Sequence, residues 1–240
     1  MTPIRIGILT PSSNTVLEPA TARMLHDTPH ITAHFARFRV TRIALAPEAL
    51  AQFDPAPVLE AAQLLADAHP HVIAWSGTSA SWLGFHTDRT LCAAITAATG
   101  VPATSSILGL EHALDRLGAH SLGLVTPYTP DVQARIVANY AATGRPVLAE
   151  RHLNDPGNYS FAQYQPPQLA TLIREVAAAR PDAITTLCTN LRSTTLPAQL
   201  EPELGIPILD SIATCLWHTL LLAGANPAQI QGWGRLFTLT

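Results

Sequence analysis

Short apolar runs rich in β-branched residues alternate along the chain with longer segments in which apolar positions recur at a helical period. The short runs predict strands, at 4–9, 31–40, 72–75, 103–104, 121–125, 147–152, 183–187 and 208–209. The longer segments predict helices, at 15–26, 57–68, 87–99, 107–117, 130–143, 166–179, 196–204 and 212–223. Strict alternation of strand and helix predicts an α/β fold, with parallel sheets flanked by helices on both faces.

The chain repeats itself once. Three segments of the first half have counterparts in the second half, in the same order: 6–11 with 122–127, 71–79 with 182–190, and 100–107 with 205–212. Such self-similarity indicates two copies of one α/β unit. We therefore expect two pseudosymmetric lobes with the active site in the cleft between them. The expected boundaries are 1–117 and 118–225, and the tail 226–240 is expected to fold back on the first lobe.

Composition narrows the possible partners and the cellular setting. Of the 240 residues, 48% are hydrophobic and only 13% charged, against about 25% charged in ordinary soluble domains. This favours a large core and self-association, so we expect a homo-oligomer. The net charge of −3 without a basic run argues against nucleic-acid or anionic-membrane partners. The sequence contains no membrane-spanning run or signal peptide, and three widely spaced cysteines predict reduced thiols in the cytoplasm.

Polar motifs follow four of the predicted strands. They are Thr10–Asn14, Ser76–Ser79, Thr126–Thr129 and Cys188–Asn190. Ligands of parallel α/β sheets bind beyond the carboxyl ends of the strands. Two facing lobes would therefore bring all four motifs to one cleft.

Cys188 is the strongest candidate for catalysis. It ends an apolar strand, and a thiol with a reference pKa of about 8.5 can exchange a proton near neutral pH. A helix beginning at Thr189 or Asn190 would favour the thiolate further. The alternative is a small buried hydrophobe, as for most free cysteines. Cys92 and Cys215 lie in apolar helical runs and are predicted core residues.

Several neutral donors are candidates for holding an anion. Gly77 lets the backbone approach a ligand closely, and the hydroxyls of Thr78 and Ser79 beside it can donate to a carboxylate. Tyr128 can donate from the second copy. The alternative roles are a helix cap for the hydroxyls and a half-buried aromatic for the tyrosine. Asn14 and Asn158 can hold a carboxylate or serve as cap and turn residues.

Cofactor and metal motifs are absent. Neither a GxGxxG nor a GxxxxGK[ST] loop occurs, and the ten histidines form no HExxH pattern. His26, His30 and His34 have the spacing of helical ligands, but Pro29 interrupts them. We expect no metal and no cofactor.

Together these residues resemble the maleate isomerase and arylmalonate decarboxylase branch of the aspartate/glutamate racemase superfamily. The resemblance lies in short motifs spread over nearly the whole chain: Pro11–Thr15, Gly77–Ser81, Thr126–Tyr128, Leu187–Cys188 and Gly232–Phe237. The first is similar to an isomerase motif whose asparagine binds a carboxylate, and the second to a decarboxylase motif with glycine in place of the family's first cysteine. The resemblance implies two α/β lobes with the active site between them.

It also implies a reaction. Family racemases use two cysteines on opposite faces of the substrate carbon, and family isomerases attack the double bond with the first. This chain has Gly77 at that position, so the resemblance implies cofactor-free decarboxylation of a substituted malonate with Cys188 as the single proton donor. Thr78, Ser79, Tyr128 and the amides of Cys188 and Thr189 would hold the retained carboxylate, and the other implied substrate-binding residues are Pro11, Ser12, Asn14 and Asn158.

Two alternatives remain at this point. Ser12, Ser13 and Asn14 stand where such decarboxylases have apolar residues, so a polar loop in this chain can grip a second carboxylate. That favours an isomerase or racemase acting on a small dicarboxylate. The other alternative is a carboxylate-binding homologue without catalysis. In each case the expected partner is a small mono- or dicarboxylate.

Overall fold

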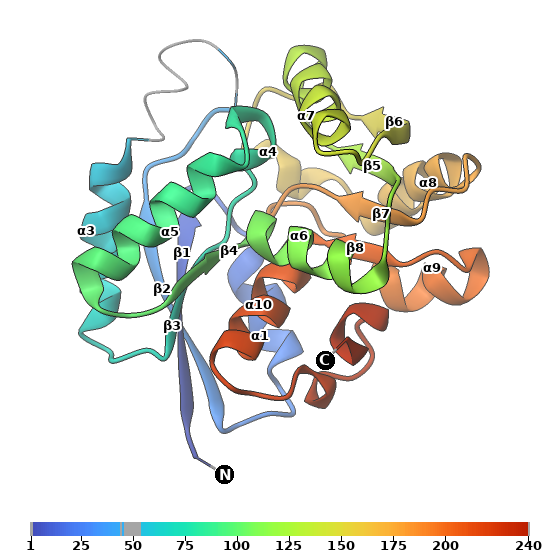
Figure 1. Cartoon of the computed structure of the whole chain (residues 1–240). Coiled ribbons are helices and arrows are strands. Elements are labelled where there is room, and N and C mark those ends of the chain that lie inside the picture. Colours follow the sequence, from blue (N-terminus) through green and yellow to red (C-terminus); the bar gives the residue numbers. More distant parts are fainter. Residues whose placement is uncertain (1, 44, 46–53, 240) are drawn as a thin grey trace.

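Two four-stranded parallel sheets form the framework of the protein (Figure 1). The structure is a computed structural model that describes residues 2–43, 45 and 54–239. The strand order is β2-β1-β3-β4 in the first sheet and β6-β5-β7-β8 in the second. The strands are β1 Ile4–Pro11, β2 Ile31–Phe38, β3 Val72–Trp75, β4 Ala103–Ser105, β5 Leu122–Thr126, β6 Val147–His152, β7 Ala183–Thr186 and β8 Ile208–Asp210. The two-lobed α/β class predicted from the sequence is confirmed.

Helices cover both faces of each sheet (Figure 1). They are α1 Leu17–Met24, α3 Pro55–Ala66, α4 Ala80–Leu83, α5 His86–Thr99, α6 Ser106–Leu117, α7 Pro130–Ala142, α8 Pro166–Ala177, α9 Leu196–Leu204 and α10 Ser211–Leu222. Short polar side chains fix several starts, because they satisfy backbone N–H groups that a first helical turn leaves without partners. Ser105 accepts from the amide of Leu108, and Asp210 accepts from the amides of Ile212 and Ala213.

The two sheets match in register as well as in order. Trp75 on β3 pairs with Leu9 and Ser105, and Thr186 on β7 pairs with Val125 and Asp210. Trp75 and Thr186 are therefore equivalent positions, and they lie two residues before Gly77 and Cys188 respectively. The repeat seen in the sequence is a repeat of the fold.

The two halves are tied together by α10. This helix comes from the second half, yet it contacts β3, β4 and α6 of the first half. In Figure 1 it lies beside α6 in the middle of the molecule. Every residue from Ser211 to Trp217 is buried, which explains why the segment reads as strongly apolar.

The C-terminal tail contacts both halves. Its last turn, Arg235–Thr238, packs against α9, β8 and α10. Trp233 lines a surface groove with Arg23 and His26 of the first half. The tail that we expected to fold back on the first lobe therefore has contacts with both halves. Within the described ranges, no helix combines the length and apolar character needed to cross a membrane.

Candidate active site

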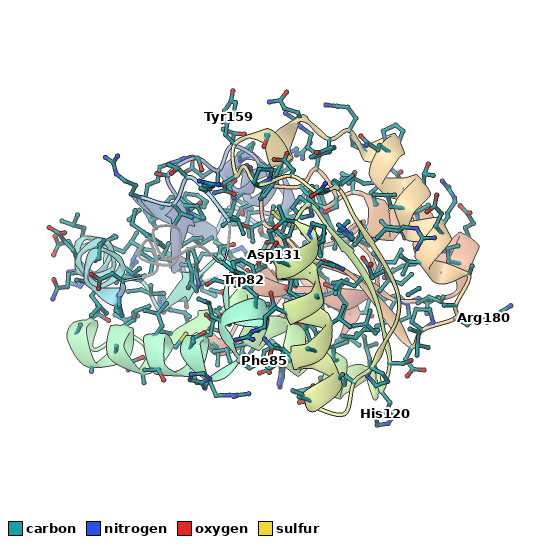
Figure 2. The ribbon with its side chains drawn as sticks, turned by 90° about the horizontal axis from the view of Figure 1, so that it is seen from above. Trp82, Phe85, His120, Asp131, Tyr159 and Arg180 are labelled. Carbon is teal, nitrogen blue, oxygen red and sulfur yellow. The ribbon has the colours of Figure 1, made fainter. Side chains whose placement is uncertain are left out.

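The carboxyl ends of the central strands of both sheets meet at one small cavity. Its wall contains Pro11, Val40, Ile43, Trp75, Gly77, Thr78, Ser79, Trp82, Tyr128, Asn158, Cys188 and Thr189. Figure 2 shows Trp82 close to the middle of the molecule, whereas Tyr159 and Arg180 lie at its edge. The cavity volume is about 20 Å³, close to the minimum that holds one water molecule. A carboxylate substrate therefore requires side chains of this wall to move.

Cys188 lies two residues beyond the end of β7 and is buried, with 3% of its surface exposed. The amide N–H of Asn190 donates to Sγ at 3.3 Å, and burial raises the pKa of the thiol to about 12. No helix begins at Thr189 or Asn190, because the next helix, α9, begins only at Leu196. The sulfur is therefore a protonated thiol in the resting site, and it lacks the helix that would have made it a thiolate.

Tyr128 faces both the thiol and the opposite lobe. Its hydroxyl lies 2.7 Å from the Thr78 hydroxyl and also hydrogen-bonds to Cys188. Burial raises its pKa well above the usual value, so the phenol keeps its proton. The edge of Trp82 packs on the ring with 5.0 Å between centroids. These contacts fix a neutral donor between the two lobes.

Thr189 joins the strand ends of the two lobes. Its hydroxyl donates to the carbonyl of Ser76 at 3.3 Å, and its own carbonyl accepts from Nδ2 of Asn14 at 2.9 Å. Thr189 and Ser79 both belong to the cavity wall. The four motifs predicted to meet in one cleft do meet.

The two candidate asparagines have different positions. Asn14 is buried outside the cavity wall, where Oδ1 accepts from the amides of Val16 and Leu17 at the start of α1. Asn158 belongs to the wall, and its Nδ2 donates to Ser13 Oγ at 2.9 Å. Asn14 thus has the capping role that was its alternative reading, and Asn158 is the asparagine placed to reach a ligand.

The two remaining candidates from the sequence, Pro11 and Ser12, also differ in whether they belong to the cavity wall. Pro11 lies in the wall. Ser12 is exposed, lies outside the wall, and accepts from the amide of Val40 at 3.3 Å. Ser12 therefore holds the loop rather than a ligand in this arrangement.

Gly77 has no space for a side chain. A Cβ built on it would lie 1.9 Å from Cζ2 of the Trp75 indole. Trp75 is itself fixed, at 2% exposure and with its ring 4.9 Å from that of Phe38. The first lobe thus presents an aromatic edge where the second presents a thiol.

Sequence reasoning missed the apolar part of the wall. Trp75, Trp82, Val40 and Ile43 all read as members of apolar runs, and such residues are usually core. One signal was present in the repeat: the residue two positions before Cys188 is Thr186, and the residue two positions before Gly77 is a tryptophan. Among the described residues, no three His, Cys, Asp or Glu side chains are grouped so that they can hold a metal ion.

The arrangement has a defined chemical capacity. Hydroxyl donors of Thr78, Ser79 and Tyr128 line a buried space in which charge on a carboxylate oxygen can be stabilised. One protonated thiol borders the same space, and in the other lobe the Trp75 indole occupies the position equivalent to that thiol. Such a site can stabilise an anion and deliver a proton from one side.

The fold and the site define a class: two-lobed α/β enzymes whose active site lies where the strand ends of two pseudosymmetric sheets meet. The chain belongs to the arylmalonate decarboxylase family, whose sequence model matches residues 14–237. This confirms the resemblance to the arylmalonate decarboxylase and maleate isomerase branch.

The relatives include enzymes of two kinds. The chain is 28% identical over 237 residues to arylmalonate decarboxylase of Bordetella bronchiseptica, covering 97% of this chain and 95% of that one. It is 30% identical over 242 residues to maleate isomerase of Nocardia farcinica, covering 97% and 94%. Homology therefore supports an enzyme, and leaves open whether it is a decarboxylase or an isomerase.

Solved structures of both kinds share the fold. One is a Nocardia farcinica maleate cis-trans isomerase mutant with a covalently bound succinylcysteine intermediate, at a TM-score of 0.88, 26% identity and 98% coverage of each chain. Another is a liganded arylmalonate decarboxylase mutant in which a glycine is replaced by cysteine and a cysteine by serine. It matches at a TM-score of 0.87, 25% identity and full coverage of each chain.

Proposed function

We propose that the protein is a cofactor-independent decarboxylase of a substituted malonate, in which Cys188 protonates an enediolate intermediate. The reaction breaks the bond between the α-carbon and one carboxylate, which leaves as CO2. The electron pair passes onto the retained carboxylate. The thiol proton then bonds to the α-carbon, and solvent returns a proton to the sulfur.

The observation that carries this proposal is the pair Gly77 and Trp75. A two-base racemase needs a second acid or base on the opposite face, and addition to an alkene needs a soft nucleophile. Glycine provides neither, and the indole fills the space that a thiol on residue 77 would need. Decarboxylation requires only an anion site and one proton donor.

The donors across the cavity suit the retained carboxylate. Thr78 and Tyr128 approach from opposite lobes, and Thr189 borders the same space. They can converge on oxygens that gain charge as CO2 leaves. Each fixed donor of this type contributes about 3 kcal/mol to lowering a barrier in acyl-transfer enzymes.

The apolar wall suits the departing carboxylate. Val40, Ile43 and Trp75 give the cavity wall an apolar part. A carboxylate in contact with such a surface loses hydration that the neutral product CO2 does not need. The raised pKa of Cys188 keeps its proton available until the carbanion forms, and the amide of Asn190 stabilises the thiolate that results.

A second candidate is isomerisation of a small dicarboxylate. It is favoured by Asn158, which belongs to the wall and can grip a second carboxylate, and by the 30% identity to a maleate isomerase. In that case Cys188 would act alone, without the nucleophile that family isomerases have in the first lobe.

Product analysis separates the two candidates. The protein is incubated in heavy water with phenylmalonate, methylmalonate or maleate, and proton NMR follows the products while released CO2 is trapped. Monocarboxylate carrying deuterium on the α-carbon, with stoichiometric CO2, is the expected result. Fumarate from maleate without CO2 would replace the decarboxylase assignment by the isomerase one. Cys92→Ala serves as the control variant, since Cys92 is a buried thiol outside the cavity wall.

A further inference from the structure

The loop that carries Cys188 connects β7 to α9, and most of its residues from 187 to 195 are buried. Buried polar groups need hydrogen-bond partners within the protein, because water does not reach them. One acidic side chain supplies such a partner to this loop. It is Asp210, the last residue of β8, whose Oδ2 atom accepts a hydrogen bond from Ser193.

Four neutral donors surround the carboxyl group of Asp210, which is 0% exposed. Oδ1 accepts from the amides of Ile212 and Ala213 at 2.9 and 3.1 Å. Oδ2 accepts from the hydroxyls of Ser193 and Thr186 at 2.5 and 3.4 Å. An ionised carboxylate accepts at both oxygens and donates at neither. This set of donors therefore suits the charged form.

The contacts of Asp210 hold the chain on both sides of Cys188. Thr186 precedes the cysteine by two residues and is paired with Asp210 between β7 and β8. The carbonyl of Thr186 also accepts from the amide of Cys188, at 3.3 Å. Ser193 lies further along the same loop. Asp210 thus anchors the segment before the sulfur and the segment after it.

The charge of Asp210 also acts on the sulfur. Burial is the main cause of the raised pKa of the Cys188 thiol, and the negative charge of Asp210 raises that pKa further, because two negative charges in one buried region repel each other. Tyr128, which also faces the sulfur, keeps its own proton. The carboxylate therefore favours the thiol over the thiolate.

Capping alone does not require this charge. Ser105, the equivalent residue of the first copy, is neutral and still caps α6 by accepting from the amide of Leu108 at 3.0 Å. An acid at this place is costly, since burial raises the pKa of Asp210 to about 6 and so disfavours its ionisation. The second copy has the acid, and it is the copy that has the thiol. The charge is therefore expected to serve the thiol.

We propose that Asp210 is a positioning residue for Cys188: as a carboxylate, it anchors the loop that carries the thiol and opposes loss of the thiol proton before the substrate carbanion forms. The proposal rests on the decarboxylase function and adds a residue to its machinery. Asp210 lies outside the cavity wall, so it acts through Cys188 and does not touch the substrate.

The titration of the thiol tests this role without turnover. The protein is labelled with ¹³Cβ-cysteine, and NMR follows the Cβ shift of Cys188, assigned as the signal missing from Cys188→Ala. With a pKa of about 12, the wild-type thiol should stay protonated up to about pH 10.5. Asp210→Asn removes the charge and keeps the shape and the cap. Its thiol pKa should fall by about 1 unit, so the thiolate fraction at pH 10.5 should rise several-fold.

Two further signals serve as controls in the same titration. Asp131 is another acid of the second half, in the first turn of α7, but it is exposed (Figure 2). Asp131→Asn should therefore leave the Cys188 signal as in the wild type. Burial raises the pKa of the Cys92 thiol strongly, so its signal should remain that of a thiol in every variant while the fold is intact.

Kinetics separate the anchor from the charge. Ser193→Ala removes the hydroxyl that binds Asp210 and keeps the carboxylate. It should lower kcat for malonate decarboxylation about 10-fold, because a thiol that is held less precisely reacts more slowly. Its KM should stay within about 2-fold of the wild type, since neither residue touches the substrate, and its thiol should titrate as in the wild type. Asp210→Asn should lower kcat and shift the thiol titration.

The outcomes separate this proposal from the reaction. A Cys188 signal that follows the wild-type curve in Asp210→Asn would overturn the role of the charge. Full kcat in Ser193→Ala would overturn the role of the anchor. If the Cys188 titration shifts in Asp210→Asn but no malonate loses CO2, the link between Asp210 and the thiol stands and the decarboxylase proposal fails.

Discussion

The ends of β3 and β7 are the same place in two copies of one fold, and they are built in opposite ways. The last residue of β7 has a small side chain, Thr186, and two residues later Cys188 has room for its thiol. On β3 the equivalent side chain is the indole of Trp75, and Gly77 has room for nothing. In one lobe this space holds the thiol of Cys188, and in the other lobe the indole of Trp75 fills it. A single substitution at residue 77 therefore cannot restore symmetry.

The neighbouring positions differ less. Ser105 and Asp210 are the last residues of β4 and β8, and both cap the helix that follows. The fold needs a cap at this point in each copy, so both copies keep one.

The largest expected effect comes from removing the thiol. Cys188→Ala should lower kcat for malonate decarboxylation about 10³-fold, because proton transfer by a positioned group contributes 10²–10⁴-fold. Steady-state CO2 release measures the change. Cys92→Ala, another buried thiol, should retain wild-type kcat, and an equal loss in both variants would mean that Cys188 has no special role.

The next prediction concerns Tyr128, one of the hydrogen-bond donors that lie between the two lobes. Tyr128→Phe should lower kcat about 10²-fold, as removal of one oxyanion donor does in other enzymes. Tyr140 provides the control, because it is buried and no residue that the structure describes hydrogen-bonds to its hydroxyl. Kinetics of Tyr140→Phe should match the wild type. A Tyr128→Phe enzyme with full kcat would show that the phenol does not contact the developing charge.

Measurements of stability test the β3 side of the comparison, where the Trp75 indole fills the space beside Gly77. Gly77→Ala should reduce the free energy of unfolding by roughly 1–3 kcal/mol, because its Cβ overlaps the indole. Gly7→Ala is the matched control, since its Cβ would meet Ile73 at 3.3 Å and should cost less. Urea denaturation measures both. In a Trp75→Ala background the cost of Gly77→Ala should fall, and an unchanged cost would mean that Trp75 is not the obstacle.

The smallest effect concerns the buried acid behind Trp75. Burial raises the pKa of Asp88 to about 7, above the ordinary value of 3.8, so ionisation disfavours the folded state. Its contribution to stability is complete below about pH 4 and is lost as pH rises through about 7. The melting temperature of the wild type should therefore fall by a few degrees between pH 4 and pH 8 relative to Asp88→Asn. Asp131→Asn should leave the wild-type slope unchanged, and identical slopes in all three proteins would contradict the raised pKa.

Periodicity predicted the elements well because it reports burial directly. The strand at 72–75 and the helix at 196–204 have the predicted bounds. The predicted strand 31–40 ends at Phe38, and the four-residue helix α4 was missed. A single helical turn is too short to show a period, so α4 left no pattern in the sequence.

The residues of the candidate site were predictable from the sequence only in part. Cys188, Thr78 and Tyr128 were predictable because polar residues at strand ends have few structural reasons to be there. Asn14 was ambiguous because the same side-chain amide can cap a helix or bind a substrate carboxylate. Trp75 could not be predicted as a site residue from the sequence, because burial in the core is enough to explain a tryptophan on this strand. Only the coordinates show that its edge occupies the space beside Gly77.

One measurement tests the single-thiol site most directly: the chirality of the product from methyl(phenyl)malonate, read by chiral chromatography. Loss of CO2 from this prochiral diacid gives 2-phenylpropanoate, whose configuration records the face that received the proton. The wild-type protein should give almost entirely one enantiomer, because Cys188 stands on one side and the Trp75 indole on the other. A racemic product, formed at a rate that depends on Cys188, would show that the proton arrives from both faces and would contradict the proposed asymmetry of the site.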